Sequence, residues 1–234
     1  MEAITRIAKE KFPRLFYWLY GLKSRRYKKL SASEIFTEKF ENNLWHGDES
    51  LSGPGSSMDN TRVVRQKLPG LLRSLGVRRM LDIPCGDFFW MNHIELPVEE
   101  YIGADSVEAL IVDNQRKYGR PGREFQTIDL LKDPLPRVDV IFCRDCLVHF
   151  SYSDVRRALK QMQDSGSTYL LTTTYPEKAP NVDILTGQWR PLNLQKPPFS
   201  FPAPIQMFLE ESTEQNGFCA DKSLGLWVLN TLSG

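Results

Sequence analysis

Two short segments near the middle of the chain constrain its fold more than any other feature. Met80-Leu81-Asp82-Ile83-Pro84-Cys85-Gly86-Asp87 has the pattern of a buried strand that runs into a tight turn. Nineteen positions after Gly86, Tyr101-Ile102-Gly103-Ala104-Asp105 has the pattern of a second strand that ends in a carboxylate. In a doubly wound sheet, adjacent parallel strands bring such ends to one crevice, where a ligand can approach the turn and the acid can bind a ribose diol. The pair predicts an α/β fold with a doubly wound, mostly parallel sheet and a nucleoside-binding crevice.

The turn after the first strand argues against a dinucleotide ligand. A pyrophosphate site needs Gly-x-Gly-x-x-Gly, and the corresponding positions here are Pro84, Gly86 and Phe89. Proline has no N–H, and Phe89 would obstruct close packing of a helix on the strand. Asp82 and Asp87 add negative charge where a pyrophosphate would lie. These carboxylates suit a cofactor with a cationic end, such as the ammonium and sulfonium groups of S-adenosylmethionine.

The sequence resembles the class I S-adenosylmethionine-dependent methyltransferases at this point. Leu81–Asp87 is similar to the first motif of that superfamily, in an Asp-x-Pro-Cys-Gly-Asp variant associated with an uncharacterised bacterial subgroup. Asp105 matches the acid that holds the ribose hydroxyls, Asp129 the acid that contacts the adenine amino group, and Val138–Asp145 the fourth strand. The resemblance covers roughly residues 60 to 232. It implies a Rossmann-like sheet of seven strands with the last antiparallel, and S-adenosyl-L-methionine as the cofactor.

The loop at 45–57 is rich in Gly, Ser and Pro, yet it also contains Trp45 and Leu51. A flexible linker is one interpretation, and we prefer a lid that folds over the cofactor. Trp90 is expected either to stack on adenine or to belong to the core. Together, motif and lid give the expected cofactor-binding residues: Asp82, Pro84, Gly86, Asp87, Trp90, Asp105, Asp129, Leu130, Arg144, Ser52, Gly53 and Ser56.

The end of the fourth strand supplies the candidate catalytic residues Arg144, Asp145 and His149. Methyl transfer depends mainly on positioning, but a hydroxyl acceptor also needs a base to remove its proton. His149 is the first candidate, because imidazole titrates near neutral pH, and a capping or core role is an equal alternative. Asp145 would orient His149 or act alone. Arg144 would either pair with Asp82, Asp87 or Asp105, or hold an acidic substrate.

The segment 175–204 contains seven prolines and little regular pattern. A long loop of this kind is usually functional or disordered, and we expect a cap that covers the substrate. An exposed Trp189 beside Arg190 and Asn193 would suit a sugar, and Asp183 is a further candidate base. The expected substrate-binding residues are Trp45, Tyr175, Asp183, Trp189, Arg190 and Asn193. Segments 52–57 and 189–194 also resemble uncharacterised family members, some associated with glycan assembly.

Residues 1–30 carry nine Lys/Arg against two Glu, with apolar side chains at near-helical spacing. We expect a cationic helix, interrupted early by Pro13, that packs on the domain or on the partner in a homodimer. The alternative is peripheral contact with a membrane surface. The net charge of +1 argues against a nucleic-acid substrate, and no segment has the pattern of a signal peptide or membrane span. We therefore expect a cytoplasmic protein.

The four cysteines are too few and too scattered for a disulfide framework. Cys143 and Cys146 have C-x-x-C spacing, but a zinc site would need a second pair. We therefore expect buried or site-lining thiols and no metal.

Periodicity predicts helices at 33–43, 61–75, 88–94, 106–118 and 152–164, with a further helix at 202–211. Strands are expected at 79–84, 101–105, 124–128, 138–143, 168–174 and 224–230. Residues 1–58 would form a helical extension with the lid. Residues 59–234 would form the cofactor-binding domain, with the cap at about 175–204.

The functional hypothesis is O-methylation of a sugar, glycan or other polar small molecule. A catalytically silent, nucleoside-binding regulatory or scaffold subunit is the alternative. N-methylation or carboxyl methylation of a small molecule or peptide is a lesser one.

Overall fold

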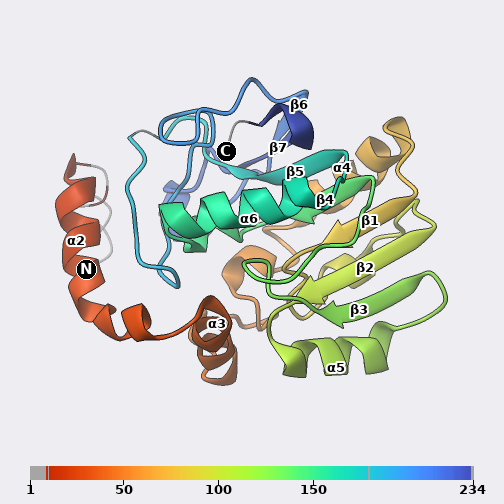
Figure 1. Ribbon diagram of the computed structural model, residues 1–234, viewed down its shortest axis with the longest axis horizontal. Coiled ribbons are helices and arrows are strands. Elements are labelled where there is room, and N and C mark those ends of the chain that lie inside the picture. Colours follow the sequence, from red (N-terminus) through yellow and green to blue (C-terminus); the bar gives the residue numbers. More distant parts are fainter. Residues whose placement is uncertain (1–8, 10, 179, 233–234) are drawn as a thin grey trace.

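A computed structural model describes residues 9, 11–178 and 180–232. Its centre is one seven-stranded sheet in the order β3-β2-β1-β4-β5-β7-β6 (Figure 1). The strands are β1 (Arg79–Asp82), β2 (Glu100–Asp105), β3 (Arg123–Thr127), β4 (Val140–Cys143), β5 (Tyr169–Thr174), β6 (Gln206–Leu209) and β7 (Ser223–Val228). Strand β7 runs antiparallel to both of its neighbours, and the remaining pairs are parallel. The predicted doubly wound sheet with an antiparallel last strand is confirmed.

Hydrophobic side chains cover both faces of the sheet. Helix α6 (Tyr152–Asp164) packs on one face, and α4 (Arg62–Ser74) and α5 (Glu108–Tyr118) contribute to the core on the other. Successive strand residues point to opposite faces, so Leu81 joins the α6 core and Met80 the α4 core. Burial on both faces is the reason that the strands read as nearly continuous apolar segments.

Local signals mark the end of α4 and the start of α6. Helix α4 lies within the expected 61–75 span and is followed by Gly76, whose φ of +63° favours glycine. Helix α6 has the expected bounds, and the Ser151 side chain caps it by accepting a hydrogen bond from Asp154 N.

Two predicted helices are wrong. Residues 88–94 form only the single 3-10 turn η3 (Met91–His93), because Phe88 has a φ of +56° and its ring packs against Tyr101 and Phe125. Residues 202–211 contain strand β6, because the open edge of β7 offers backbone partners, beginning with Ile205 N to Leu226 O.

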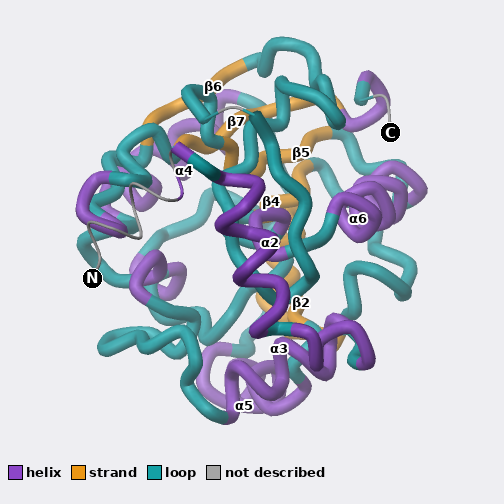
Figure 2. The backbone as a smooth tube through the Cα atoms, turned by 90° about the vertical axis from the view of Figure 1, so that its left-hand side faces the viewer, coloured by secondary structure: helices purple, strands orange, loops and turns teal. Residues whose placement is uncertain are grey.

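The N-terminal part consists of α2 (Pro13–Lys23), the 3-10 turn η1 (Arg25–Lys29) and α3 (Ala32–Glu41). Pro13 does not interrupt a helix but begins α2, since a first-turn residue needs no backbone N–H. Ser31 and Glu34 form a reciprocal capping box at the start of α3. Helix α2 lies on the outside of the molecule, at the left of Figure 1 and the front of Figure 2. No helix in the described ranges is long and apolar enough to span a membrane.

Candidate functional site

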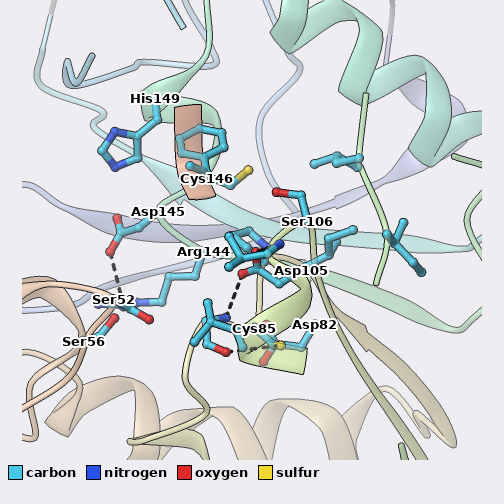
Figure 3. Close-up of a pocket in the computed structure, with 18 of the residues that line it drawn as sticks. Ser52, Ser56, Asp82, Cys85, Asp105, Ser106, Arg144, Asp145, Cys146 and His149 are labelled. Carbon is cyan, nitrogen blue, oxygen red and sulfur yellow. Dashed lines mark hydrogen bonds and ion pairs between the residues drawn. The ribbon is translucent and has the colours of Figure 1, made fainter. Parts of the chain in front are cut away.

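The main cavity lies at the carboxyl ends of the central parallel strands (Figure 3). Its empty volume is about 1070 Å³ when the open mouth is included. Strands β1, β2 and β4 and the loop after β3 form its floor, while α3 and the loop 45–56 contribute the opposite wall. The predicted site residues that line it are Trp45, Ser52, Ser56, Asp82, Pro84, Gly86, Trp90, Asp105, Asp129, Leu130, Arg144, Asp145 and His149.

The turn after β1 is held by the carboxylate at the end of β2. Gly86 N donates to Asp105 Oδ2 at 3.2 Å, and Val107 N donates to Asp105 Oδ1 at 3.0 Å. Gly86 has a φ of +55°, and a Cβ atom there would lie 2.1 Å from Ser52 Oγ. The backbone of this turn and the loop above it therefore approach closely only because residue 86 is glycine.

The pKa values of two carboxyl groups at this end of the sheet are raised. Burial raises the pKa of Asp82 to about 7, although a hydrogen bond from the Tyr101 hydroxyl works in the opposite direction. Burial likewise raises the pKa of Asp105 to about 6, against the effect of the backbone donors at Val107 and Gly86. A cationic ligand in the cavity would favour the ionised form of both groups.

Asp87 holds the loop 45–57 and does not line the cavity, contrary to the expectation that it binds the cofactor. Its carboxylate accepts hydrogen bonds from Ser50 Oγ at 2.9 Å, Leu51 N at 2.8 Å and Ser52 Oγ at 3.3 Å. Gly53 is also outside the lining. Its φ of +96° shapes the loop, and a Cβ atom there would lie 3.0 Å from Trp45 Cβ.

Arg144 attaches the loop 45–57 to the end of β4 and belongs to a buried charge cluster. Its Nη2 donates to Gly55 O at 2.8 Å and to Glu210 Oε2 at 2.7 Å, and its Nη1 lies 3.2 Å from Asp145 Oδ2. The predicted ion pair with Asp82, Asp87 or Asp105 is replaced by these partners. The guanidinium carbon lies 5.4 Å from the centre of the Trp90 ring, so Trp90 packs against Arg144 while also lining the cavity.

Three members of the charge cluster were missed from the sequence: Glu210, Glu214 and Lys222. Lys222 Nζ lies 2.5 Å from Asp145 Oδ2 and 2.8 Å from Glu214 Oε2. Burial disfavours both charged forms, but ion pairing outweighs it, lowering the pKa of Asp145 and raising that of Lys222. Glu210 directly follows β6 and Lys222 directly precedes β7. A charged residue at the end of a strand was the only feature of the sequence that could have indicated either of them. The structure thus holds an ionised carboxylate, Asp145, at the cavity wall.

His149 presents one nitrogen with a lone pair. Its Nδ1 lies 2.8 Å from Gln188 O, and a carbonyl oxygen only accepts, so Nδ1 carries the proton and Nε2 does not. Burial lowers the pKa of His149 to about 4, so the ring is neutral at physiological pH. Asp145 does not orient His149 through a hydrogen bond to Nδ1, because Gln188 takes that position.

The cap, 175–204, is packed into the α6 side of the molecule and is not an exposed sugar platform. Arg190 is fully buried and donates to the carbonyls of Val182, Leu147 and Phe150. The other predicted cap residues also have structural partners: Asn193 donates to Pro176 O, Asp183 accepts from Tyr152 N, and Trp189 packs against Tyr175. None of these five predicted substrate residues (Tyr175, Asp183, Trp189, Arg190 and Asn193) is among the residues that line the main cavity.

All four cysteines are buried and unpaired, and Cys85 and Cys146 line the cavity. In the described part of the chain, no group of three or more potential His, Cys, Asp or Glu ligands could hold a metal ion.

Comparison with known proteins places the fold. No protein-family model and no curated protein matches the sequence. The N-methyltransferase NodS from Bradyrhizobium japonicum WM9, solved with S-adenosyl-L-homocysteine, matches with a TM-score of 0.56 and 14% identity over 82% of this chain and 96% of that chain. The methyltransferase domain of bacterial CtHen1-C matches with a TM-score of 0.52 and 10% identity over 76% of this chain and 100% of that chain.

A third match extends over a shorter region. The chain spans about half (49%) of CalS10, an amino pentose methyltransferase from Micromonospora echinaspora, with 16% identity over 47% of this chain and a TM-score of 0.41. At such identities the likeness concerns architecture. The strand order, the antiparallel β7 and the likeness to NodS and CtHen1-C together show that the chain has the class I, Rossmann-like fold of the S-adenosylmethionine-dependent methyltransferases.

Proposed function

We propose that this protein is an S-adenosylmethionine-dependent methyltransferase that methylates a hydroxyl group of a sugar, glycan or other polar small molecule. The observation that carries the proposal is one cavity lined by three carboxylates from successive strand ends, Asp82, Asp105 and Asp129, together with the Gly86 turn. The cavity lies between β1 and β4, where the strand order reverses, and open α/β sheets bind their ligands at such a switch point.

The residues present fit such a cofactor. A Cβ atom at Gly86 would fill the cradle beside Ser52, and buried carboxyl groups with raised pKa values suit a ligand that brings positive charge. In our proposal Asp105 binds the ribose hydroxyls and Asp129 the adenine amino group, while Asp82 and Gly86 face the methionine end. When bound, S-adenosylmethionine supplies an electrophilic methyl group on a sulfonium.

The lid would keep water from the reacting groups. Asp87 holds its first part and Arg144 holds Gly55, so the loop is tied to both sides of the cavity. Ser52 and Ser56 line the cavity from this loop and can donate hydrogen bonds to the cofactor. Since methyl transfer depends on alignment, a tied lid would contribute mainly by positioning.

His149 is the proposed general base. Its Nε2 lone pair would accept the proton of the acceptor hydroxyl as the new methyl–oxygen bond forms, and Gln188 O would hold the ring through Nδ1–H. Burial lowers the His149 pKa, and anionic Asp145 offsets part of that effect and would stabilise the imidazolium that results. Trp45 offers a ring face for sugar C–H groups on the opposite wall.

The test begins with binding. Calorimetry should detect S-adenosylhomocysteine binding to the full chain, and the absence of any binding would overturn the proposal. Tritiated-methyl transfer into a cell extract, followed by fractionation, should then identify the acceptor. Release of the label by mild base would indicate a methyl ester, and label that stays on nitrogen when the purified product is analysed would indicate a methylated amine, so either result would reject methylation of a hydroxyl group.

The role of His149 is tested by His149→Gln, with His93→Gln as the matched control on an exposed position. We expect H149Q to bind S-adenosylhomocysteine within about twofold of wild type and to lose turnover by about 100-fold or more. H93Q should keep both. Full turnover in H149Q would assign the base to Asp145 or remove the need for one.

A further inference from the structure

We propose that the outward face of α2, together with the cationic turn η1 after it, docks this protein on an anionic lipid surface. This inference does not depend on the proposed methyl transfer. Leu15, Trp18, Leu19 and Leu22 follow the i, i+3, i+4, i+7 spacing of a single helix face. Their exposed fractions are 55%, 62%, 49% and 43%, and Phe12, just before the helix, is 64% exposed.

The opposite face of α2 is attached to the domain. Tyr17 is 5% exposed, and Pro13 and Tyr17 share a cavity with Val182, Arg190 and Pro191 of the cap. The helix therefore has a fixed inward side, and its outward side is the apolar stripe. Figures 1 and 2 show α2 on the outside of the molecule in both views. Single apolar side chains are common on protein surfaces, but five large ones grouped on the outward side of this segment form a patch typical of an interaction site.

The positive charge around this stripe indicates an anionic partner. Residues 11–29 contain seven Lys/Arg and no Asp or Glu. Those described as exposed are Lys11, Arg14, Arg25, Arg26, Lys28 and Lys29. Arg26 pairs with Glu38 of α3, and the net charge of the segment remains positive.

A second copy of the chain is a poorer occupant than a lipid surface. Pairing two such faces would bring two sets of like charges together, and the repulsion opposes the gain from apolar burial. An anionic bilayer accepts both features, because leucine and phenylalanine enter the acyl boundary while tryptophan, lysine and arginine favour the headgroup level. The helix would lie in the plane of the interface.

Sedimentation of the full chain with vesicles tests the proposal. Phosphatidylcholine vesicles that contain phosphatidylglycerol should bind the protein, and pure phosphatidylcholine vesicles should bind it at least about tenfold more weakly. Raising the salt from about 0.1 M to about 0.5 M should weaken binding to the anionic vesicles by about tenfold or more. Equal binding to both vesicle types, or none to either, would overturn the proposal without any variant.

Two variants and a control localise the contact. L15S/W18S should bind anionic vesicles about 100-fold more weakly, and K28E/K29E should bind more weakly with a smaller salt effect. Val112→Ser is the matched control, since Val112 is 60% exposed on α5, and it should bind like wild type. Wild-type unfolding midpoints would show that the variants are folded. A concentration-dependent dimer that L15S/W18S dissolves would instead identify a second copy as the occupant and reject the lipid surface.

Discussion

Replacing Asp82 with asparagine should stabilise the free protein and weaken cofactor binding. The Asp82 side chain is buried, and the Tyr101 hydroxyl donates a hydrogen bond to its Oδ2. Burial raises the Asp82 pKa from 3.8 to about 7. Each pH unit of this displacement corresponds to about 1.4 kcal/mol. The ionised carboxylate therefore costs the folded state about 4 kcal/mol above pH 7, relative to the unfolded chain.

The pH dependence has a definite sign. Between about pH 4 and about pH 7, the folded protein retains a proton on Asp82 that the unfolded chain releases, so this group makes stability fall as pH rises. Asp82→Asn keeps an oxygen that can accept the Tyr101 hydrogen bond and removes the charge. The gain in unfolding free energy of D82N over wild type should therefore grow by about 3 kcal/mol between about pH 5 and about pH 8.

Urea denaturation of both proteins at several pH values is the measurement. Asp164→Asn is the control, because it makes the same substitution at a half-exposed carboxylate on α6, beside Lys160. Parallel profiles for D82N and wild type, or a D82N that is less stable at pH 8, would refute the assignment of a buried, destabilising carboxylate. Weaker S-adenosylhomocysteine binding by D82N would show that this residue favours function at the expense of stability.

Further predictions concern the same cavity and its supports. Affinity for S-adenosylmethionine should rise by about tenfold or more between about pH 5 and about pH 8, as Asp105 and Asp82 lose their protons; calorimetry across this range checks it, and a flat profile would contradict it. Asp105→Ala should abolish cofactor binding in the same assay, and unchanged affinity would move the ribose site elsewhere. Arg190→Met should lower the unfolding free energy by about 3 kcal/mol or more, because the carbonyls of Val182, Leu147 and Phe150 lose the guanidinium donor and only Leu147 O keeps another, Phe150 N; an unchanged urea midpoint would argue against a structural role. Glu210→Gln should cost about 3 to 5 kcal/mol in the same measurement, since it leaves Arg144 and Lys222 with one carboxylate fewer, and a neutral effect would show that the cluster tolerates the loss.

The strand pattern and the acids at the strand ends were predictable because both are local. Alternating strands and helices of typical length predict a parallel sheet, and parallel strands necessarily deliver their carboxyl ends to one edge. That Asp82, Asp105 and Asp129 line one cavity could therefore be predicted without any knowledge of side-chain packing. The Gly76 helix end is equally local, whereas the sequence left Ser151, Ser153 and Asp154 as alternative caps of α6 and the structure selects Ser151.

The partners of charged side chains were not predictable, because they depend on strand order. Strand β7 starts where β5 ends, with Thr174 opposite Ser223, and β6 ends beside the same residue, with Leu209 opposite Ser223. Glu210 and Lys222 consequently reach the carboxyl edge of the sheet and the side chains of Arg144 and Asp145. No short sequence pattern predicts a contact across 66 or 77 positions.

The amino-acid sequence alone determined the class of fold and the acidic edge of its sheet, since periodicity and strand-end residues act over a few positions. Tertiary structure alone decided that Asp87 holds the loop 45–57, that Arg190 and Asn193 are interior residues, and that 206–209 is a strand. In each case a buried polar group or an open strand edge needed a partner, and only the folded chain determines which partner is within reach.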